Sequence, residues 1–267
     1  MSVLRIFLLF GFLSITSNNI FADDILQDGK RFPSLLGKTT VNNLAERHVD
    51  SVYNALHLIS YGLKKEVFFT AYKGYQYLLA NKKLAKTQLL TICDYSQPST
   101  AKRLYVLDVE NGEILYHTLV SHGKKSGQTY ATTFSNLNSS HKSSLGFMVT
   151  ADTYFGKAGY SMHFDGMEMG FNDQVRNRAI VMHGSYYVNE NRADEGEQMG
   201  RSYGCPAIPY ALHSSIINTI KGGSCFFAYH PTHTYLQRSK IINAKFSWPA
   251  ITQNDAENLM DKSVSAK

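Results

Sequence analysis

From Arg103 to Val120 the chain reads RLYVLDVENGEILYHTLV, and this stretch decides the class of fold. Two runs rich in aliphatic and aromatic residues flank Asn111-Gly112. An Asn-Gly pair between two such runs is the strongest short-range signal for a β-hairpin. We therefore predict antiparallel strands over residues 103–109 and 113–120.

Elements of the same kind extend outward from this hairpin. Short apolar runs typical of buried strands lie at residues 89–93, 144–150, 178–183 and 224–229. A helix is expected over 209–221, ended by Gly222-Gly223. Upstream, apolar residues recur at helical spacing over 41–64 and 66–82. The sum predicts a mostly β core with N-terminal helices and one late helix, α+β overall.

The N-terminus has the pattern of a secretory signal peptide. Arg5 precedes an apolar run over residues 6–13, and Ala22 precedes Asp23-Asp24. The run is too short to span a bilayer comfortably. We expect residues 1–22 to be cleaved, leaving an exported, periplasmic chain with no membrane span. An uncleaved N-terminal anchor is the alternative.

Net charge indicates the class of binding partner, and the cysteine count indicates a free thiol. The 267 residues carry a net charge of +6, and loss of Arg5 without any acid leaves +5. A basic exported chain suits an anionic polymer such as a cell wall. The chain has no arginine-rich run and no zinc-finger spacing, so nucleic acid is not an expected partner. Three cysteines leave at least one free thiol, while Cys93 and Cys225 form either a disulfide or two buried thiols.

The segments that can carry chemistry are Met182-His183-Gly184 and Gly204-Cys205-Pro206. A thiol becomes a useful nucleophile when a nearby base favours the thiolate. A histidine at the end of a strand is held rigidly, and Gly204 lets the backbone turn sharply before Cys205. The amides of Gly204 and Cys205 are then candidate donors for a developing oxyanion.

These residues resemble the L,D-transpeptidases of bacterial cell-wall synthesis, whose signature is a His-Gly, a spacer and Ser/Thr-His-Gly-Cys. Here His183-Gly184 is followed, after residues 185–201, by Ser202-Tyr203-Gly204-Cys205. The variant sequence looks like the divergent murein L,D-transpeptidase branch of the family. Tyr203 replaces the usual histidine, and the usual arginine two residues after the cysteine is absent.

The resemblance implies an L,D-transpeptidase-like β-sandwich or barrel core and an acyl transfer on peptidoglycan stem peptides through a Cys205 thioester. It makes His183 the general base, and a backbone carbonyl beside that base implicates Gly184. The sequence pattern as a whole divides the chain into a signal peptide (1–22), an N-terminal helical appendage (23–87), a catalytic domain that carries the resemblance (88–237) and a polar C-terminal tail (238–267).

Substrate-binding candidates are Arg201, Ser202, Tyr203 and His163. Arg201 would replace the missing arginine or bond a loop, and His163 is either a pocket residue, an alternative base or a structural histidine. No metal or organic cofactor is expected, since His163, His183 and Cys205 lack the tight spacing of a zinc site. A thiol hydrolase on the same substrate and a non-catalytic wall-binding module remain alternatives, and a monomer is the default.

Overall fold

The computed structural model describes residues 26–27, 30–31 and 38–246, with side chains from Ala45 onward. The expected signal peptide therefore lies outside the described residues. The chain divides into two compact units, residues 1–41 and 42–267. In the first, β1 (Leu26–Gln27) pairs antiparallel with β2 (Lys30–Arg31). Within the described part, no helix is long and apolar enough to cross a membrane.

The second unit is built on one mixed sheet of eight strands, with the spatial order β5-β4-β3-β10-β6-β7-β8-β9. Two of its pairings are parallel, β3 with β10 and β8 with β9, and the others are antiparallel. The strands are β3 (Leu89–Asp94), β4 (Leu104–Asp108), β5 (Glu113–Thr118), β6 (Gly146–Gly156), β7 (Gly159–Gly166), β8 (Val181–Ser185), β9 (Ala207–Pro209) and β10 (Cys225–Tyr229).

The predicted hairpin is confirmed as β4 and β5. Asp108 lies opposite Glu113, and Gly112 has the positive φ of 71° that the turn requires. The Asp108 carboxylate accepts hydrogen bonds from the backbone amide and the side-chain amide of Asn111, at 2.9 Å each. Local turn chemistry therefore sets the register next to the turn, up to the irregularity between Val106 and Leu107.

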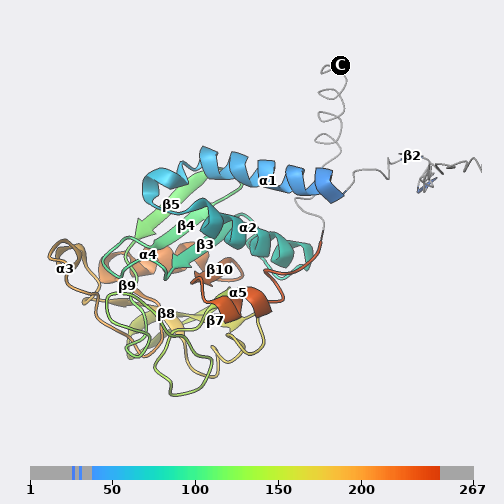
Figure 1. The fold of residues 1–267 in the computed structure, drawn as a ribbon. Coiled ribbons are helices and arrows are strands. Elements are labelled where there is room, and N and C mark those ends of the chain that lie inside the picture. The colour runs from blue at the N-terminus through green and yellow to red at the C-terminus, as the bar shows by residue number, and fades with distance from the viewer. Residues whose placement is uncertain (1–25, 28–29, 32–37, 247–267) are drawn as a thin grey trace, which may run out of the picture. The chain divides into compact units, whose positions relative to one another are not determined.

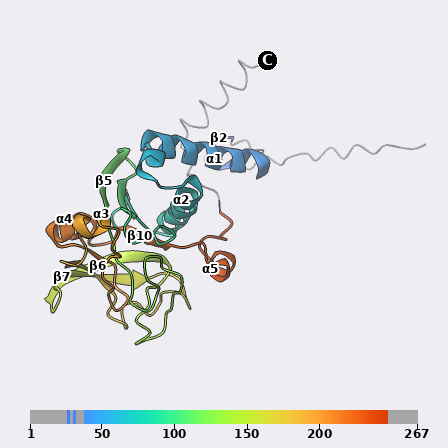
Figure 2. The ribbon, with the colours of Figure 1, turned by 60° about the vertical axis from the view of Figure 1, so that its left-hand side comes forward.

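Helices pack against the sheet, and a helix is the last element of the described chain. They are α1 (Lys38–Ala55), the 3₁₀ turn η1 (Leu58–Tyr61), α2 (Lys65–Ala80), α3 (Glu190–Asp194), α4 (Tyr210–Ile220) and α5 (His233–Arg238). Figures 1 and 2 show α2 on the side of β3 and β10, with β6 and β7 beyond them. Gly74 permits this packing, because a Cβ there would lie 2.0 Å from the Phe147 ring.

The predicted fold class, a mostly β core with helices, is confirmed. The first predicted helix is shorter than expected: α1 stops at Ala55, because His57 takes a left-handed conformation and η1 follows. Helix α5 and the full extent of β7 were not predicted. Cys93 and Cys225 are buried free thiols.

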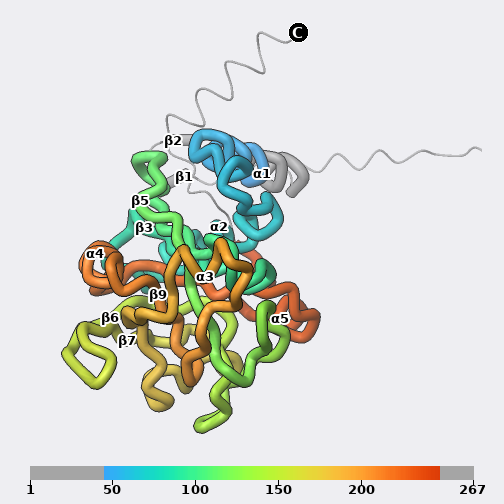
Figure 3. The backbone as a smooth tube through the Cα atoms, turned by 90° about the vertical axis from the view of Figure 1, so that its left-hand side faces the viewer, coloured from blue at the N-terminus to red at the C-terminus, as the bar shows by residue number. Residues whose placement is uncertain are grey.

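The segment between β8 and β9 is folded back onto the sheet by a small apolar cluster of its own. Val188 and Met199 are buried there against Leu119 and Ala207. Figure 3 shows α3 and β9 on the face of the molecule that this segment covers. The loop is therefore anchored at both of its ends, one after β8 and one before β9.

The chain stays packed beyond residue 238. Glu168 is buried and accepts hydrogen bonds from the Phe147 amide at 2.7 Å, the Tyr235 hydroxyl at 2.8 Å and the Ser239 hydroxyl. Burial raises the pKa of this carboxyl group, and the three donors oppose the rise. The domain boundaries at residues 87 and 237 remain predictions.

Candidate active site

The candidate site lies where β8 and β9 run side by side. His183 is opposite Ala207 in this parallel pair. Residues two positions apart on a strand share a face, so Val181 lies on the His183 face of β8. Cys205, two positions before Ala207, enters the same region from the turn that leads into β9. The register thus brings together two segments that are 22 residues apart in the sequence.

The imidazole of His183 is held by its own strand. Its Nδ1 lies 2.9 Å from the carbonyl oxygen of Gly184. A carbonyl oxygen can only accept, so Nδ1 carries the proton in the neutral ring. The other ring nitrogen, Nε2, is then the basic one. The half-buried side chain therefore presents a lone pair while its orientation is fixed.

Gly184 has a second role in the packing behind the base. A Cβ at this position would lie 2.6 Å from Cγ of His213, which is buried on α4. Only glycine lets β8 and α4 approach this closely. Gly184 therefore has two structural roles. Its carbonyl oxygen orients His183, and its lack of a side chain lets β8 pack closely against α4.

The thiol of Cys205 rests against the turn that precedes β8. Its Sγ accepts from the Val181 amide at 3.4 Å and donates to the Ala179 carbonyl at 3.7 Å. Burial raises the pKa of the thiol, while the Val181 amide and the positive charge of Arg178 lower it. Neither of these two hydrogen-bond partners of the thiol is His183.

Serine side chains fix the turn that carries Cys205. The Ser202 hydroxyl donates to the Cys205 carbonyl at 2.6 Å and accepts from the Gly204 amide at 3.1 Å. The buried Ser143 hydroxyl donates to the Gly204 carbonyl at 3.2 Å. Gly204 has a φ of 126°, and a Cβ there would lie 2.7 Å from the Lys142 carbonyl oxygen.

These bonds bear on the expected oxyanion donors. The Gly204 amide is engaged by Ser202, so it is not free in this arrangement. The Cys205 amide faces its own sulfur. Two amides were expected from the sequence as oxyanion donors. Of these, the Cys205 amide has no other acceptor among the described residues.

Tyr203 and Arg201 lie at the exposed rim of the turn. The Tyr203 ring is 65% exposed, with Lys124 Nζ 4.3 Å from its centroid and the His141 ring edge-on at 4.6 Å. Arg201 donates to the carbonyls of Lys124 and Gly127, at 3.1 and 3.2 Å. The rim is therefore basic. The two hydrogen bonds of Arg201 go to the loop at residues 124–127.

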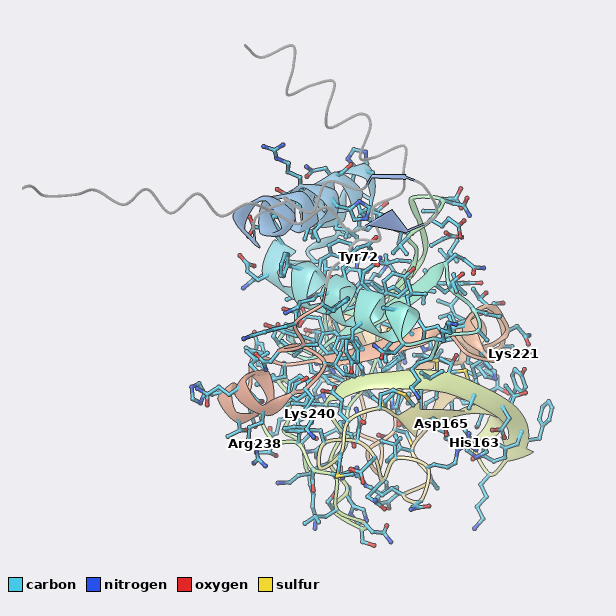
Figure 4. All side chains as sticks on the ribbon, turned by 90° about the vertical axis from the view of Figure 1, so that its right-hand side faces the viewer. Tyr72, His163, Asp165, Lys221, Arg238 and Lys240 are labelled. Carbon is cyan, nitrogen blue, oxygen red and sulfur yellow. The ribbon has the colours of Figure 1, made fainter. Side chains whose placement is uncertain are left out.

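His163 belongs to a surface network on β6, β7 and the following turn. Its Nδ1 lies 2.9 Å from Asp152, and Arg176 bridges Asp152 and Asp165 at 2.9 and 2.6 Å. Figure 4 shows His163 and Asp165 close together on β7. The Tyr154 ring stacks on His163 at 4.5 Å. Within the described ranges, no three His, Cys, Asp or Glu side chains form a cluster that could hold a metal.

Two residues near the nucleophile were not predicted. Arg178 lies beside Gly204, as described below. His122 is fully buried with Nδ1 2.8 Å from Arg103, and its carbonyl accepts from the Ser202 amide at 3.1 Å. Burial, with the Arg103 charge, lowers the pKa of His122 to about 4. The sequence signal that was available is the single Ser-His-Gly of the chain, Ser121 to Gly123.

The profile of the L,D-transpeptidase catalytic domain matches residues 60–229. The chain belongs to this family. The L,D-transpeptidase match begins within η1 and includes α2 and every strand of the eight-stranded sheet. It confirms the resemblance that the sequence motif indicated. No curated protein sequence matches the chain.

Several solved structures are similar to this chain at low identity. An L,D-transpeptidase from Mycobacterium smegmatis is 11% identical with a TM-score of 0.33, covering 54% of this chain and 59% of its own. An L,D-transpeptidase from Stackebrandtia nassauensis is 14% identical at 0.33, covering 61% and 66%. The helical cell shape determining protein Pgp2 from Campylobacter jejuni is 12% identical at 0.33, covering 60% and 56%. The chain thus spans less than two thirds of each solved chain, and family membership rests on the sequence match.

Proposed function

We propose that this member of the L,D-transpeptidase family is an active cysteine acyltransferase on peptidoglycan stem peptides, with Cys205 as nucleophile and His183 as general base. The observation that carries the proposal is the His183–Gly184 hydrogen bond beside the Cys205 turn. It leaves a basic nitrogen on the strand next to a thiol, which is the arrangement that nucleophilic catalysis by cysteine requires.

The proposed first half-reaction forms a thioester. After rotation of the Cys205 side chain, His183 Nε2 takes the thiol proton, and the sulfur attacks the carbonyl carbon of the third stem residue. The oxyanion of the tetrahedral intermediate is stabilised by the Cys205 amide. The C–N bond to the terminal D-residue then breaks, and His183 returns its proton to the leaving amine.

The second half-reaction releases the acyl group. An amine of another stem peptide attacks the thioester carbonyl, and His183 accepts a proton from this amine. The C–S bond breaks, a new amide bond forms, and the sulfur regains a proton. Atoms and charges therefore balance without a metal or an organic cofactor.

The basic rim supports an anionic peptide as substrate. Lys124, Tyr203 and Arg201 lie around the turn that ends in Cys205. Peptide carboxylates would be attracted by the lysine and by the guanidinium nitrogens of Arg201 that do not bond the loop. Ser202 acts in this proposal by holding the turn, and His163 lies in the network with Asp152.

Water in place of the amine would make the enzyme a thiol carboxypeptidase on the same substrate. The contacts of the partly buried thiol favour neither acceptor, so the hydrolase stands as the second candidate. The export that the first 22 residues predict would bring the protein to the periplasm, where the substrate is. A monomer is proposed as the working state.

The test is product analysis with a synthetic tetrapeptide stem and an amine acceptor. We expect mass spectrometry to show release of the terminal D-residue and an acceptor adduct, both lost in Cys205→Ala. Release without an adduct would identify a hydrolase. A folded wild-type protein that neither releases the D-residue nor transfers the peptide would contradict the proposal and favour a wall-binding module.

A further inference from the structure

Arg178, in the turn before β8, is pinned by an unusual number of bonds for a half-buried side chain. Its Nη1 donates to the Ser135 carbonyl and the Ser144 hydroxyl, at 2.7 and 2.6 Å. Its Nη2 donates to the Ser140 hydroxyl and the Lys142 carbonyl, at 3.1 and 2.7 Å. Four bonds to one segment, residues 135–144, fix both the guanidinium and that segment.

The same guanidinium lies against the nucleophile turn. Its Nη2 is 3.4 Å from the point that a Cβ of Gly204 would occupy. The Lys142 carbonyl, which Arg178 holds, is 2.7 Å from that point. The next residue, Ala179, has a φ of 52°, and its carbonyl accepts from the Cys205 sulfur. Arg178 and Cys205 are therefore neighbours through Gly204 on one side and Ala179 on the other.

One donor of Arg178 has no partner. Its Nε–H is buried, and within the described part of the chain it makes no hydrogen bond. A purely structural arginine would be expected to have its buried donors paired, because an unpaired buried N–H costs free energy. The four partners of the guanidinium are carbonyl and hydroxyl oxygens, so no carboxylate of the described residues neutralises its charge.

Among the described residues, Arg178 is the charged group that acts on the Cys205 thiol. His183 lies on β8, and Tyr187, whose pKa burial raises, follows that strand. Lys142 contributes its backbone carbonyl to the Arg178 contact, and Arg201 is bonded to the loop at residues 124–127. Arg178 is accordingly the guanidinium on the thiol side of the turn.

We propose that Arg178 is a positioning residue for Cys205: it fixes residues 135–144 against Gly204 and presents an unpaired positive charge to the thiolate that forms during acyl transfer. The inference rests on the proposed function for its catalytic meaning. Arg178 lies outside the sequence motif around Cys205, so the inference gives the turn before β8 an electrostatic role in the site. A positive charge nearby stabilises a thiolate and opposes the effect of burial on the thiol.

The experiment measures the rate at which iodoacetamide alkylates Cys205 as a function of pH. The peptide that contains Cys205 is quantified by mass spectrometry, because Cys93 and Cys225 are buried. In Arg178→Gln we expect the midpoint of the profile to rise by about one pH unit. Below the midpoint the thiolate fraction should fall about tenfold. The more basic thiolate is also more nucleophilic, which offsets part of this loss, so the alkylation rate should fall by roughly threefold.

Three variants separate charge from packing. Arg178→Lys keeps the charge but loses the fork, so it should lower the melting temperature while the midpoint stays near the wild-type value. Ser144→Ala removes one anchor and keeps the charge, and should behave in the same way. Arg176→Gln removes an exposed arginine from the same turn, so it controls for general loss of charge. If Arg178→Gln does not fold, Arg178→Met retains the aliphatic stem and replaces it.

An unchanged midpoint in folded Arg178→Gln or Arg178→Met would overturn the inference, as would an equal shift in Arg178→Lys. Alkylation does not need acyl transfer, so the two proposals fail separately. The alkylation profiles of wild type and variants could depend on Arg178 as expected while the wild type forms no acyl-enzyme. That result would leave this inference standing and refute the proposed function.

Discussion

The Nδ1 atom of His183 lies 2.9 Å from the carbonyl oxygen of Gly184, the next residue on the same strand. This contact needs no distant partner to orient the base. It depends only on β8 keeping its conformation, which the pairing with β7 and β9 secures. The tautomer and the direction of the imidazole are therefore built into the strand.

Replacing His183 should remove the proton acceptor without disturbing the fold. In His183→Gln we expect acylation of Cys205 to slow by about 10²- to 10⁴-fold, the range for loss of a general base. The rate of carbapenem adduct formation at neutral pH is the measurement. His163→Gln is the matched control, and a larger loss there than in His183→Gln would make His163 the base.

Gly204 should not tolerate a side chain. A Cβ would lie 2.7 Å from the Lys142 carbonyl oxygen and 2.9 Å from Cδ1 of Ile180, at a φ of 126°. We expect Gly204→Ala to lower the free energy of unfolding by about 2–4 kcal/mol, as strain at special backbone positions does.

Urea unfolding of Gly204→Ala beside Gly196→Ala makes this comparison. Gly196 also has a positive φ, 72°, but nothing lies within 4 Å of its Cβ position. It should cost about 1 kcal/mol, the penalty of the left-handed conformation alone. Equal losses at the two positions would show that the close contacts of Gly204 do not matter.

Ser202 should matter through the turn rather than through substrate contact. Its hydroxyl bonds the carbonyl of Cys205 and the amide of Gly204, at 2.6 and 3.1 Å. Ser202→Ala should cost about 1–2 kcal/mol of stability for the lost hydrogen bonds. In the acylation kinetics we expect a lower rate constant with little change in the concentration dependence. A raised half-saturation concentration alone would instead indicate substrate binding.

The pH dependence of stability should carry the signature of His122. Its pKa is about 4 in the fold against an ordinary 6.5, because burial and Arg103 disfavour the charged ring. The unfolded chain therefore binds the proton more readily. Stability is fully present above pH 6.5 and is lost as pH falls toward 4, by up to about 3 kcal/mol.

Urea unfolding between pH 7 and 5 tests this linkage before most carboxylates titrate. Wild type should lose stability over this range, and His122→Asn should be less stable at pH 7 but flatter with pH. Parallel curves for the two proteins would mean that His122 is not the group responsible.

The sequence could predict what depends on neighbours in the chain. The Asn111-Gly112 hairpin follows from local turn chemistry, and the His183-Gly184 and Gly204-Cys205 pairs carry conformational meaning in themselves. Arg178 could not be predicted in this way, because its four partners lie 34 to 43 residues earlier. The packing of Ser239 on Glu168, 71 residues away, has the same origin.

The same distinction explains the oxyanion donors. The amides of Gly204 and Cys205 were predicted together because they are adjacent at a glycine turn. The Ser202 hydroxyl occupies the first of them, and that competition depends on how the turn closes rather than on which residues it contains. From the sequence alone, Ser202 could cap a turn, contact substrate or hold the turn by hydrogen bonds.

An activated Cys205 is tested most simply by the intact mass of the protein after incubation with a carbapenem, measured beside Cys205→Ala. We expect a covalent adduct on the wild type and none on the variant, with the adduct mapped to the peptide that contains Cys205. A folded wild-type protein that stays unmodified under these conditions would contradict an activated Cys205.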